Sequence, residues 1–150
     1  MVTLQVHRFT RADYEKLPEG YPVELIDGEL LKEPSPTYGH QDLVGHVFAK
    51  ALEVVGRGRT VTSPIDVFVD EYNVLQPDVL VLEEALGPHA LRATLPVLVV
   101  EILSPSSAFW DRQVKRRIYL DAGVLEVWLV DPETETIEVH EAGGSRAAGR

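Results

Sequence analysis

Apolar residues repeat along this chain with helical spacing in one long stretch and in short, strand-like runs elsewhere. Over residues 39–55 they recur every three or four positions, which predicts an amphipathic helix that ends at Gly56-Arg57-Gly58. The runs at 61–69 and 74–82 predict two strands with a turn between them. Residues 97–103 are almost all apolar, so this segment predicts a central strand covered on both faces.

Cap and turn residues place the other elements. Thr10 precedes a short helical segment as an N-cap, and Asp27-Gly28 predicts a tight hairpin because both residues tolerate positive φ angles. Ser107 and Gly123 bracket a second helix, predicted over residues 108–122. The remaining strands are predicted at 23–26, 29–31, 125–130 and 136–140.

The order of these elements predicts an α/β fold. From residue 39 the chain gives a helix, three strands, a helix and a strand, which fits a mixed sheet flanked by helices. We expect the N-terminal β-hairpin at 23–31 to lie at an edge of that sheet. At 150 residues the chain is expected to form a single domain over residues 1–150. The small and polar residues from 143 onward predict a flexible tail.

The composition excludes several classes of site. The chain has no cysteine, which excludes disulfides, thiolate zinc sites and a cysteine nucleophile, and fits a reducing compartment. It has no apolar run of membrane-spanning length and no signal-peptide pattern at its start, so we expect a cytoplasmic protein with no membrane association. The net charge of −10 argues against a protein that binds nucleic acid through a wide basic surface.

Two carboxylates lie at the ends of apolar runs. Asp78 opens the run that continues to Leu82, and Glu101 lies near the end of the run that starts at Val97. Burying a carboxylate in such a segment is costly unless a cation or a hydrogen-bond network compensates. Carboxylate oxygens are ligands that Mg²⁺ and Mn²⁺ prefer, so the pair suggests a metal site.

A lysine on the following helix can reach the same region. On that predicted helix Lys115 lies beside an apolar stripe that begins at Trp110, which places it at the border of the buried face. A lysine at the rim of a core can hold a water molecule or neutralise a developing charge. Arg112 and Arg116 project elsewhere and are candidates for contacts with DNA phosphates.

The same residues carry a resemblance to known proteins. The order of Pro77-Asp78 and Glu101, in a layout of helix, three strands, helix and strand, resembles the PD-(D/E)-x-K nuclease superfamily. Over about residues 8–141 the chain resembles the Uma-two family of restriction-endonuclease-like proteins. The strings that carry this likeness are Glu24-Leu25-Ile26-Asp27-Gly28-Glu29-Leu30, Gln76-Pro77-Asp78, Val100-Glu101-Ile102-Leu103-Ser104-Pro105-Ser106, Asp111 to Lys115, and Val127-Trp128-Leu129-Val130-Asp131-Pro132.

The resemblance implies a restriction-endonuclease-like fold and an endonuclease that hydrolyses DNA with Mg²⁺ or Mn²⁺. Asp78 and Glu101 would bind the metal, with the backbone carbonyl of Ile102 as a further ligand. The superfamily places a lysine two residues after the glutamate, where this chain has Leu103. The resemblance therefore implies that Lys115 takes over that catalytic role.

Further expectations concern the surroundings of the site. Glu24 and His40 are secondary candidates for it, since one lies in the family-like hairpin and the other begins the apolar face of the long helix. Cleavage of both DNA strands usually needs two active sites, so we expect a homodimer.

Each candidate residue also has a purely structural interpretation. Asp78 can cap a turn, Glu101 can form a structural salt bridge with Lys115 or Arg112, and Lys115 can be a solvated helix residue. Glu24 alternates with apolar neighbours, which predicts a solvated face, and His40 can be a half-buried histidine with one hydrogen bond. The alternative function is therefore a non-catalytic binding or assembly module on the same nuclease-like fold.

Overall fold

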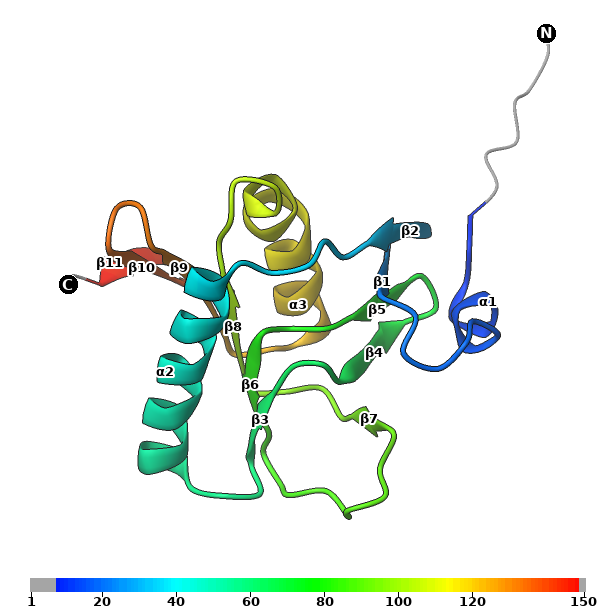
Figure 1. The fold of residues 1–150 in the computed structure, drawn as a ribbon, viewed down its shortest axis with the longest axis horizontal. Helices are drawn as coiled ribbons and strands as arrows, with labels where there is room; N and C mark the ends of the chain where they lie inside the picture. Colours follow the sequence, from blue (N-terminus) through cyan, green and yellow to red (C-terminus); the bar gives the residue numbers. More distant parts are fainter. Residues whose placement is uncertain (1–7, 149–150) are drawn as a thin grey trace, which may run out of the picture.

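The computed structural model describes residues 8–148, which form two mixed β-sheets with helices packed against them (Figure 1). The helices are α1 (Arg11–Glu15), α2 (Tyr38–Val55), the π-helix η1 (Trp110–Lys115) and α3 (Arg116–Ala122). The strands are β1 (Val23–Ile26), β2 (Glu29–Lys32), β3 (Thr60–Thr62), β4 (Asp66–Asp70), β5 (Asn73–Leu75), β6 (Val79–Val81), β7 (Arg92–Ala93), β8 (Leu98–Ile102), β9 (Glu126–Asp131), β10 (Thr136–Glu141) and β11 (Gly144–Ala148). In this described region no helix has both the length and the apolar character needed to cross a membrane.

The five-stranded sheet has the order β2-β1-β5-β4-β7, and the six-stranded sheet has the order β11-β10-β9-β8-β6-β3. Neighbouring strands are antiparallel except for the parallel pairs β4–β7 and β8–β9. The β1–β2 hairpin lies at an edge, as expected, but it is the edge of the five-stranded sheet, whereas the sequence predicts a single sheet that also contains β8.

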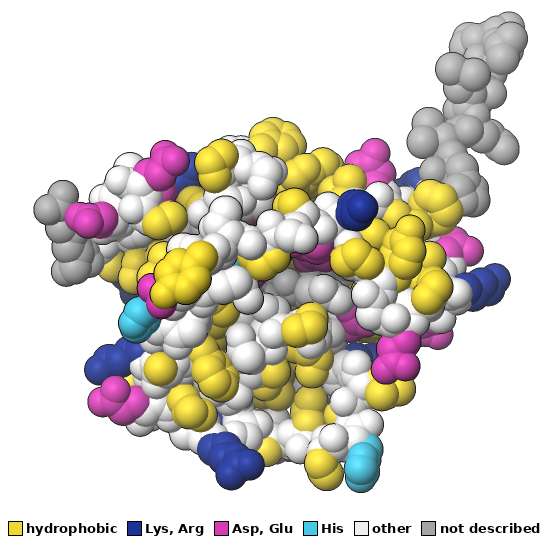
Figure 2. Space-filling view, in the orientation of Figure 1, with side chains coloured by type: hydrophobic (Ala, Val, Ile, Leu, Met, Phe, Trp, Pro, Cys, Tyr) yellow, Lys and Arg dark blue, Asp and Glu magenta, His cyan; other side chains and the backbone are white. Residues whose placement is uncertain are grey.

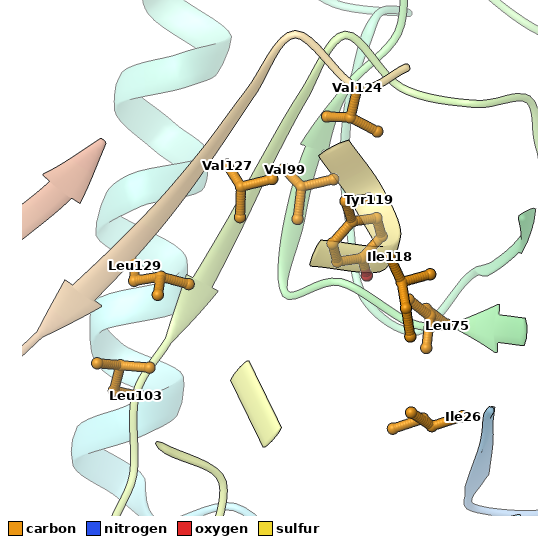
Figure 3. Close-up of a cluster of buried hydrophobic side chains, with 9 residues drawn as sticks. All are labelled: Ile26, Leu75, Val99, Leu103, Ile118, Tyr119, Val124, Val127 and Leu129. Atoms are coloured by element: carbon orange, nitrogen blue, oxygen red, sulfur yellow. The ribbon is translucent and has the colours of Figure 1, made fainter. Parts of the chain in front are cut away.

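The six-stranded sheet lies between α2 on one face and the η1–α3 helix on the other (Figure 1). Alternate residues of β8 supply the two cores: Val100 and Ile102 pack with Val44 of α2, whereas Val99 packs with Tyr119 of α3. Figure 3 shows the second core, in which side chains of α3 meet those of β8 and β9. The prediction of a central strand covered on both faces is therefore confirmed.

Local sequence signals set the ends of several elements. Thr10 accepts a hydrogen bond from the Asp13 N–H and begins α1, while Thr37 accepts one from the His40 N–H and begins α2. Asp27 and Gly28 have φ angles of 49° and 82°, the left-handed geometry that a two-residue hairpin turn requires. These caps and turns fix where the chain enters and leaves the sheets.

Two predicted strands are each divided between the two sheets. The run at 61–69 forms β3 in the six-stranded sheet and β4 in the five-stranded sheet, and the run at 74–82 is divided in the same way into β5 and β6. Pro64 and Pro77 lie at the two breaks and lack the N–H that a continuous ladder needs. Each of these two runs thus crosses once between the sheets, and the crossing in the second run brings Asp78 to their boundary.

Two other segments differ from the sequence-based expectation. The helix predicted over 108–122 contains the π-helix η1, a wider turn that often occurs at functional sites, before it continues as α3. The expected flexible tail instead contributes β11, which pairs with β10 from Glu141↔Gly144 to Ile137↔Ala148. Backbone pairing organises these small residues, and their side chains give no strand pattern that the sequence could reveal.

Candidate active site

Strands β6 and β8 part at the position of Asp78 and Glu101. The pairing of β6 with β8 ends at Val79 and Val100, so the two acidic residues follow directly beyond it. Asp78 Oδ2 accepts a hydrogen bond from the Ile102 N–H at 2.7 Å. Because the N–H and C=O of one strand residue point to the same side, the Ile102 carbonyl is directed toward Asp78 as well. The structure thus brings these residues to one boundary, and metal binding by them stays a prediction.

Lys115 is buried among three carboxylates. Its Nζ lies 3.0 Å from Glu101 Oε1, 3.2 Å from Glu24 Oε2 and 3.4 Å from Asp111 Oδ1. The Lys115 side chain is only 6% exposed, so the expectation that it lies at the rim of the core is wrong. The partners come from β1, β8 and η1, and the ammonium therefore links both sheets to the helix that covers them.

Glu24 is buried, in contrast to the solvated face that its alternation with apolar neighbours predicts. Its residue exposure is 3%, and all four residues of β1 are buried. Besides its contact with Lys115, Glu24 Oε2 accepts a hydrogen bond from the Gln76 N–H at 2.7 Å. Alternation shows which residues share a face, but not that this polar face meets a buried lysine. Glu29, on β2, is exposed as predicted.

His40 contacts Asp78 from the first turn of α2. Its Nε2 lies 3.4 Å from Asp78 Oδ2, and both side chains are largely removed from solvent. The hydrogen bond to Asp78 raises the pKa of His40 above its ordinary value, against the opposing effect of burial. The contact with the carboxylate therefore favours the protonated imidazole. His40, a secondary candidate from the sequence, thus lies against Asp78, a primary one.

The buried cluster holds more acidic groups than basic ones. Burial raises the pKa of Glu101 well above its usual range, and burial also raises the pKa of Asp111. For Lys115, burial alone would lower the pKa, but the carboxylates of Glu101, Glu24 and Asp111 outweigh it and hold the pKa well above normal. Acidic atoms are also visible at the centre of the face drawn in Figure 2. Three carboxyl groups around one ammonium favour either retained protons or a further cation.

Three residues around the cluster have no place in the sequence-based prediction of the site. Asp111 contacts Lys115 from one turn earlier in the helix, and Tyr119 donates a hydrogen bond to Glu101 Oε1 at 3.3 Å. Glu33 follows β2; partial burial of its carboxyl and a hydrogen bond with Glu24 raise its pKa to about 9, although much of its side chain is exposed. The spacing of Asp111 and Lys115 on one helix is a signal that could have identified the first.

The two arginines predicted to contact DNA differ in their surroundings. Arg112 Nη2 lies 3.1 Å from Asp131 Oδ2, and Arg112 Nε lies 3.0 Å from Glu138 Oε2. Arg112 thus joins η1 to β9 and β10 while 38% of its side chain stays exposed, and its contact with DNA phosphate stays a prediction. Arg116 donates from Nε to the Arg112 carbonyl at 2.9 Å.

The donor set suits a hard divalent cation. In residues 8–148 no three or more histidine and acidic side chains converge as a fully protein-built metal site requires. Mg²⁺ needs only one or two carboxylates, because water and substrate phosphate complete its octahedron. The contacts described for Asp78 fall on its Oδ2, and those described for Glu101 fall on its Oε1. The pair fits such an ion.

Comparison with known proteins agrees with this fold. A family model for Uma2, described as "Putative restriction endonuclease", matches residues 11–148. The chain belongs to the Uma2 family. A protein from Anabaena variabilis, described as "a putative nuclease belonging to DUF820", has a similar crystal structure, with a TM-score of 0.77 and 20% identity over 95% of this chain and 85% of that one. A search among curated proteins found no match to this Uma2 chain. The predicted restriction-endonuclease-like fold is therefore confirmed, while residue roles depend on the geometry of this chain.

Proposed function

We propose that this Uma2 protein is a metal-dependent endonuclease that hydrolyses phosphodiester bonds in DNA. The observation that carries the proposal is the burial of Lys115 against Glu101 and Glu24 at the boundary where Asp78 also lies. Titratable groups with shifted pKa values, gathered where strands part, are typical of active sites. Membership of the Uma2 family supports nucleic-acid hydrolysis in general terms.

Each residue of the proposed site has a separate role. Asp78 and Glu101 bind Mg²⁺ or Mn²⁺, and the Ile102 carbonyl is a further ligand. The ion supplies an activated water and stabilises the charge on the reacting phosphate. Lys115 adds positive charge beside that phosphate and a donor that orients the attacking water.

Neighbouring side chains hold these groups in place. Glu24 connects Lys115 to the Gln76 backbone, so it fixes the ammonium relative to the crossing between the sheets. His40 fixes Asp78 from the α2 side. Such positioning matters because a misplacement of about 1 Å in an active site can cost about a hundredfold in rate.

The proposed substrate and assembly follow from the reaction. Double-stranded DNA presents two backbones of opposite direction, so a two-fold homodimer would place one site at each strand. The net charge of −10 predicts weak, salt-sensitive binding that the metal helps by offsetting repulsion from the carboxylates.

One observation favours the alternative of a non-catalytic module. Each of the three N–H donors of Lys115 can be matched to one of its three carboxylate neighbours, which is also what a closed structural salt-bridge network would show. A metal site should be stabilised by Mg²⁺ or Mn²⁺, and a salt-bridge network alone should not.

The experiment is cleavage of supercoiled and linear DNA by the purified protein with Mg²⁺, with Mn²⁺ and with a chelator. We expect nicked or linear product only with a divalent ion, and none with Glu101→Gln. Glu29→Gln is the matched control, because it makes the same change on an exposed glutamate of the β1–β2 hairpin. Metal-independent cleavage, or equal activity of the two variants, would reject the assignment.

A further inference from the structure

One cation on the η1–α3 helix has no acidic partner. In the described residues Arg116 has no carboxylate within ion-pair distance, although the chain has 24 acidic and 14 basic residues. The other cations of this helix are paired: Arg112 with Asp131 and Glu138, Lys115 with Glu24, Glu101 and Asp111, and Arg117 with Asp27. Arg116 therefore keeps a charge available for an anion from outside.

The guanidinium of Arg116 is nevertheless held in one place. Its Nε donates to the Arg112 carbonyl at 2.9 Å, and its Nη1 lies 3.4 Å from His140 Nδ1. The side chain is partly buried between the helix and β10. A fixed guanidinium loses little conformational entropy when it binds an anion, which is what recognition of phosphate by arginine requires.

His140 holds the Arg116 guanidinium from β10. It is 7% exposed, and its Nδ1 lies 2.5 Å from Ser145 Oγ on β11. Burial and the charge of Arg116 lower the pKa of His140, which favours the neutral ring. With Nδ1 facing these donors, the proton resides on Nε2, and in the described region Nε2 is the single buried side-chain nitrogen or oxygen without a hydrogen-bond partner.

The acidic groups near His140 already have a basic partner. The nearest carboxylate oxygen to His140 Nε2 is Glu138 Oε1 at 3.8 Å, beyond hydrogen-bond distance. Glu138 is held by Arg112 through its other oxygen, and Asp131 is held by Arg112 as well. Arg112 thus offsets part of the negative charge that would otherwise repel an anion from Arg116.

We propose that Arg116, held in place by His140, forms a subsite for a backbone phosphate of the nucleic-acid substrate. The subsite rests on the proposed function, because it gives the substrate a second anchor on the helix that carries Lys115. The two arginines then have different roles. Arg116 binds a phosphate away from the bond that is cleaved, whereas Arg112 joins η1 to β9 and β10 through its ion pairs.

Inorganic phosphate is the probe that tests the subsite without cleavage. We expect phosphate to shift the imidazole ¹⁵N and ¹H resonances of His140 in the intact protein, and Arg116→Gln to abolish the shift. Arg117→Gln is the matched control, since it removes a neighbouring charge of the same helix that is already paired with Asp27. No shift in the wild type, or an equal shift in the Arg116→Gln protein, overturns the subsite whether or not the protein cleaves DNA.

DNA binding provides the second readout. In Ca²⁺, Arg116→Gln should lower the slope of log affinity against log salt by about one, the loss of one phosphate contact, and Arg117→Gln should leave it unchanged. An unaltered slope in Arg116→Gln, with cleavage by the wild type intact, overturns the subsite and leaves the nuclease assignment standing. Loss of metal-dependent cleavage in Glu101→Gln tests that assignment separately.

Discussion

Lys115 Nζ lies 3.0 Å from Glu101 Oε1. Glu101 belongs to strand β8, and Lys115 belongs to η1, which follows β8 after residues 103–109. Leu103, at the position where the superfamily places its lysine, is buried on the same face of the sheet as Glu101. The helix over that face delivers the ammonium instead. The positive charge can thus come from a different element while the acidic residue keeps its place.

Replacing Lys115 with Met should destabilise the fold. Removing one member of a buried ion-pair cluster leaves charges without compensation, so the free energy of unfolding should fall by about 3–5 kcal/mol. This revises the expectation from sequence that substitution of Lys115 would cost little stability. Urea unfolding measures the change, and Lys50→Met, at an exposed lysine paired with Glu53, is the control that should change it little.

Adding Glu101→Gln to Lys115→Met should restore part of that loss, because it removes one of the carboxylates left uncompensated. A double-mutant cycle reports the coupling between the two sites. Strictly additive effects would show that the observed contact carries no interaction energy.

Divalent metal should raise the melting temperature of the wild type. Binding to the folded state alone stabilises it by about 2.7 kcal/mol when the free ion is at a hundred times its dissociation constant. Asp78→Asn and Glu101→Gln should each abolish the effect, and Glu29→Gln should retain it. Thermal scans with Mg²⁺, Mn²⁺ and chelator distinguish the metal site from a closed salt-bridge network.

The contact of His40 with Asp78 should make stability depend on pH. The pKa of His40 is raised above 6.5 in the folded protein, so the pair stabilises the fold fully below about pH 6.5 and loses its effect as pH rises through the raised pKa. His40→Gln should therefore cost most at low pH, and the difference from wild type should shrink in alkaline buffer. Unfolding titrations from about pH 5.5 to about pH 8.5 would show a constant difference if the pairing were without effect.

Metal binding should release protons. Burial raises the pKa of Glu101 and Asp111, and the pKa of Glu33 is about 9, so the metal-free cluster retains protons that an ion displaces. Affinity should consequently increase with pH. Calorimetry in two buffers of different ionisation enthalpy counts the protons, and a count of zero would mean that these carboxyls are ionised before metal binds.

The sequence predicts local structure well where a short segment carries the whole cause. Thr10 is sufficient to begin α1, and Asp27-Gly28 is sufficient to close a hairpin. The continuous apolar run around Val100 likewise predicts a strand covered on both faces. Each signal acts within a few residues, so no knowledge of distant partners is needed.

The parts of the site that depend on distant partners were not predictable in the same way. Glu24 is buried because Lys115 and the Gln76 N–H, from other elements, satisfy its carboxylate. Arg112 is held by carboxylates on β9 and β10, and Glu33 reaches the cluster only after the hairpin folds back. A pattern along one segment cannot show which residues of distant segments will be in contact.

The metal site between Asp78 and Glu101 is tested most directly by a crystal structure of the protein soaked in Mn²⁺, with anomalous scattering used to locate the ion. We predict an anomalous peak bound by both carboxylates, which should then lie roughly 3 to 5 Å apart, with the Ile102 carbonyl as a further ligand. The same soak of Glu101→Gln should lose the peak. Carboxylates more than about 8 Å apart, or an ion bound elsewhere while this position holds none, would contradict the assignment.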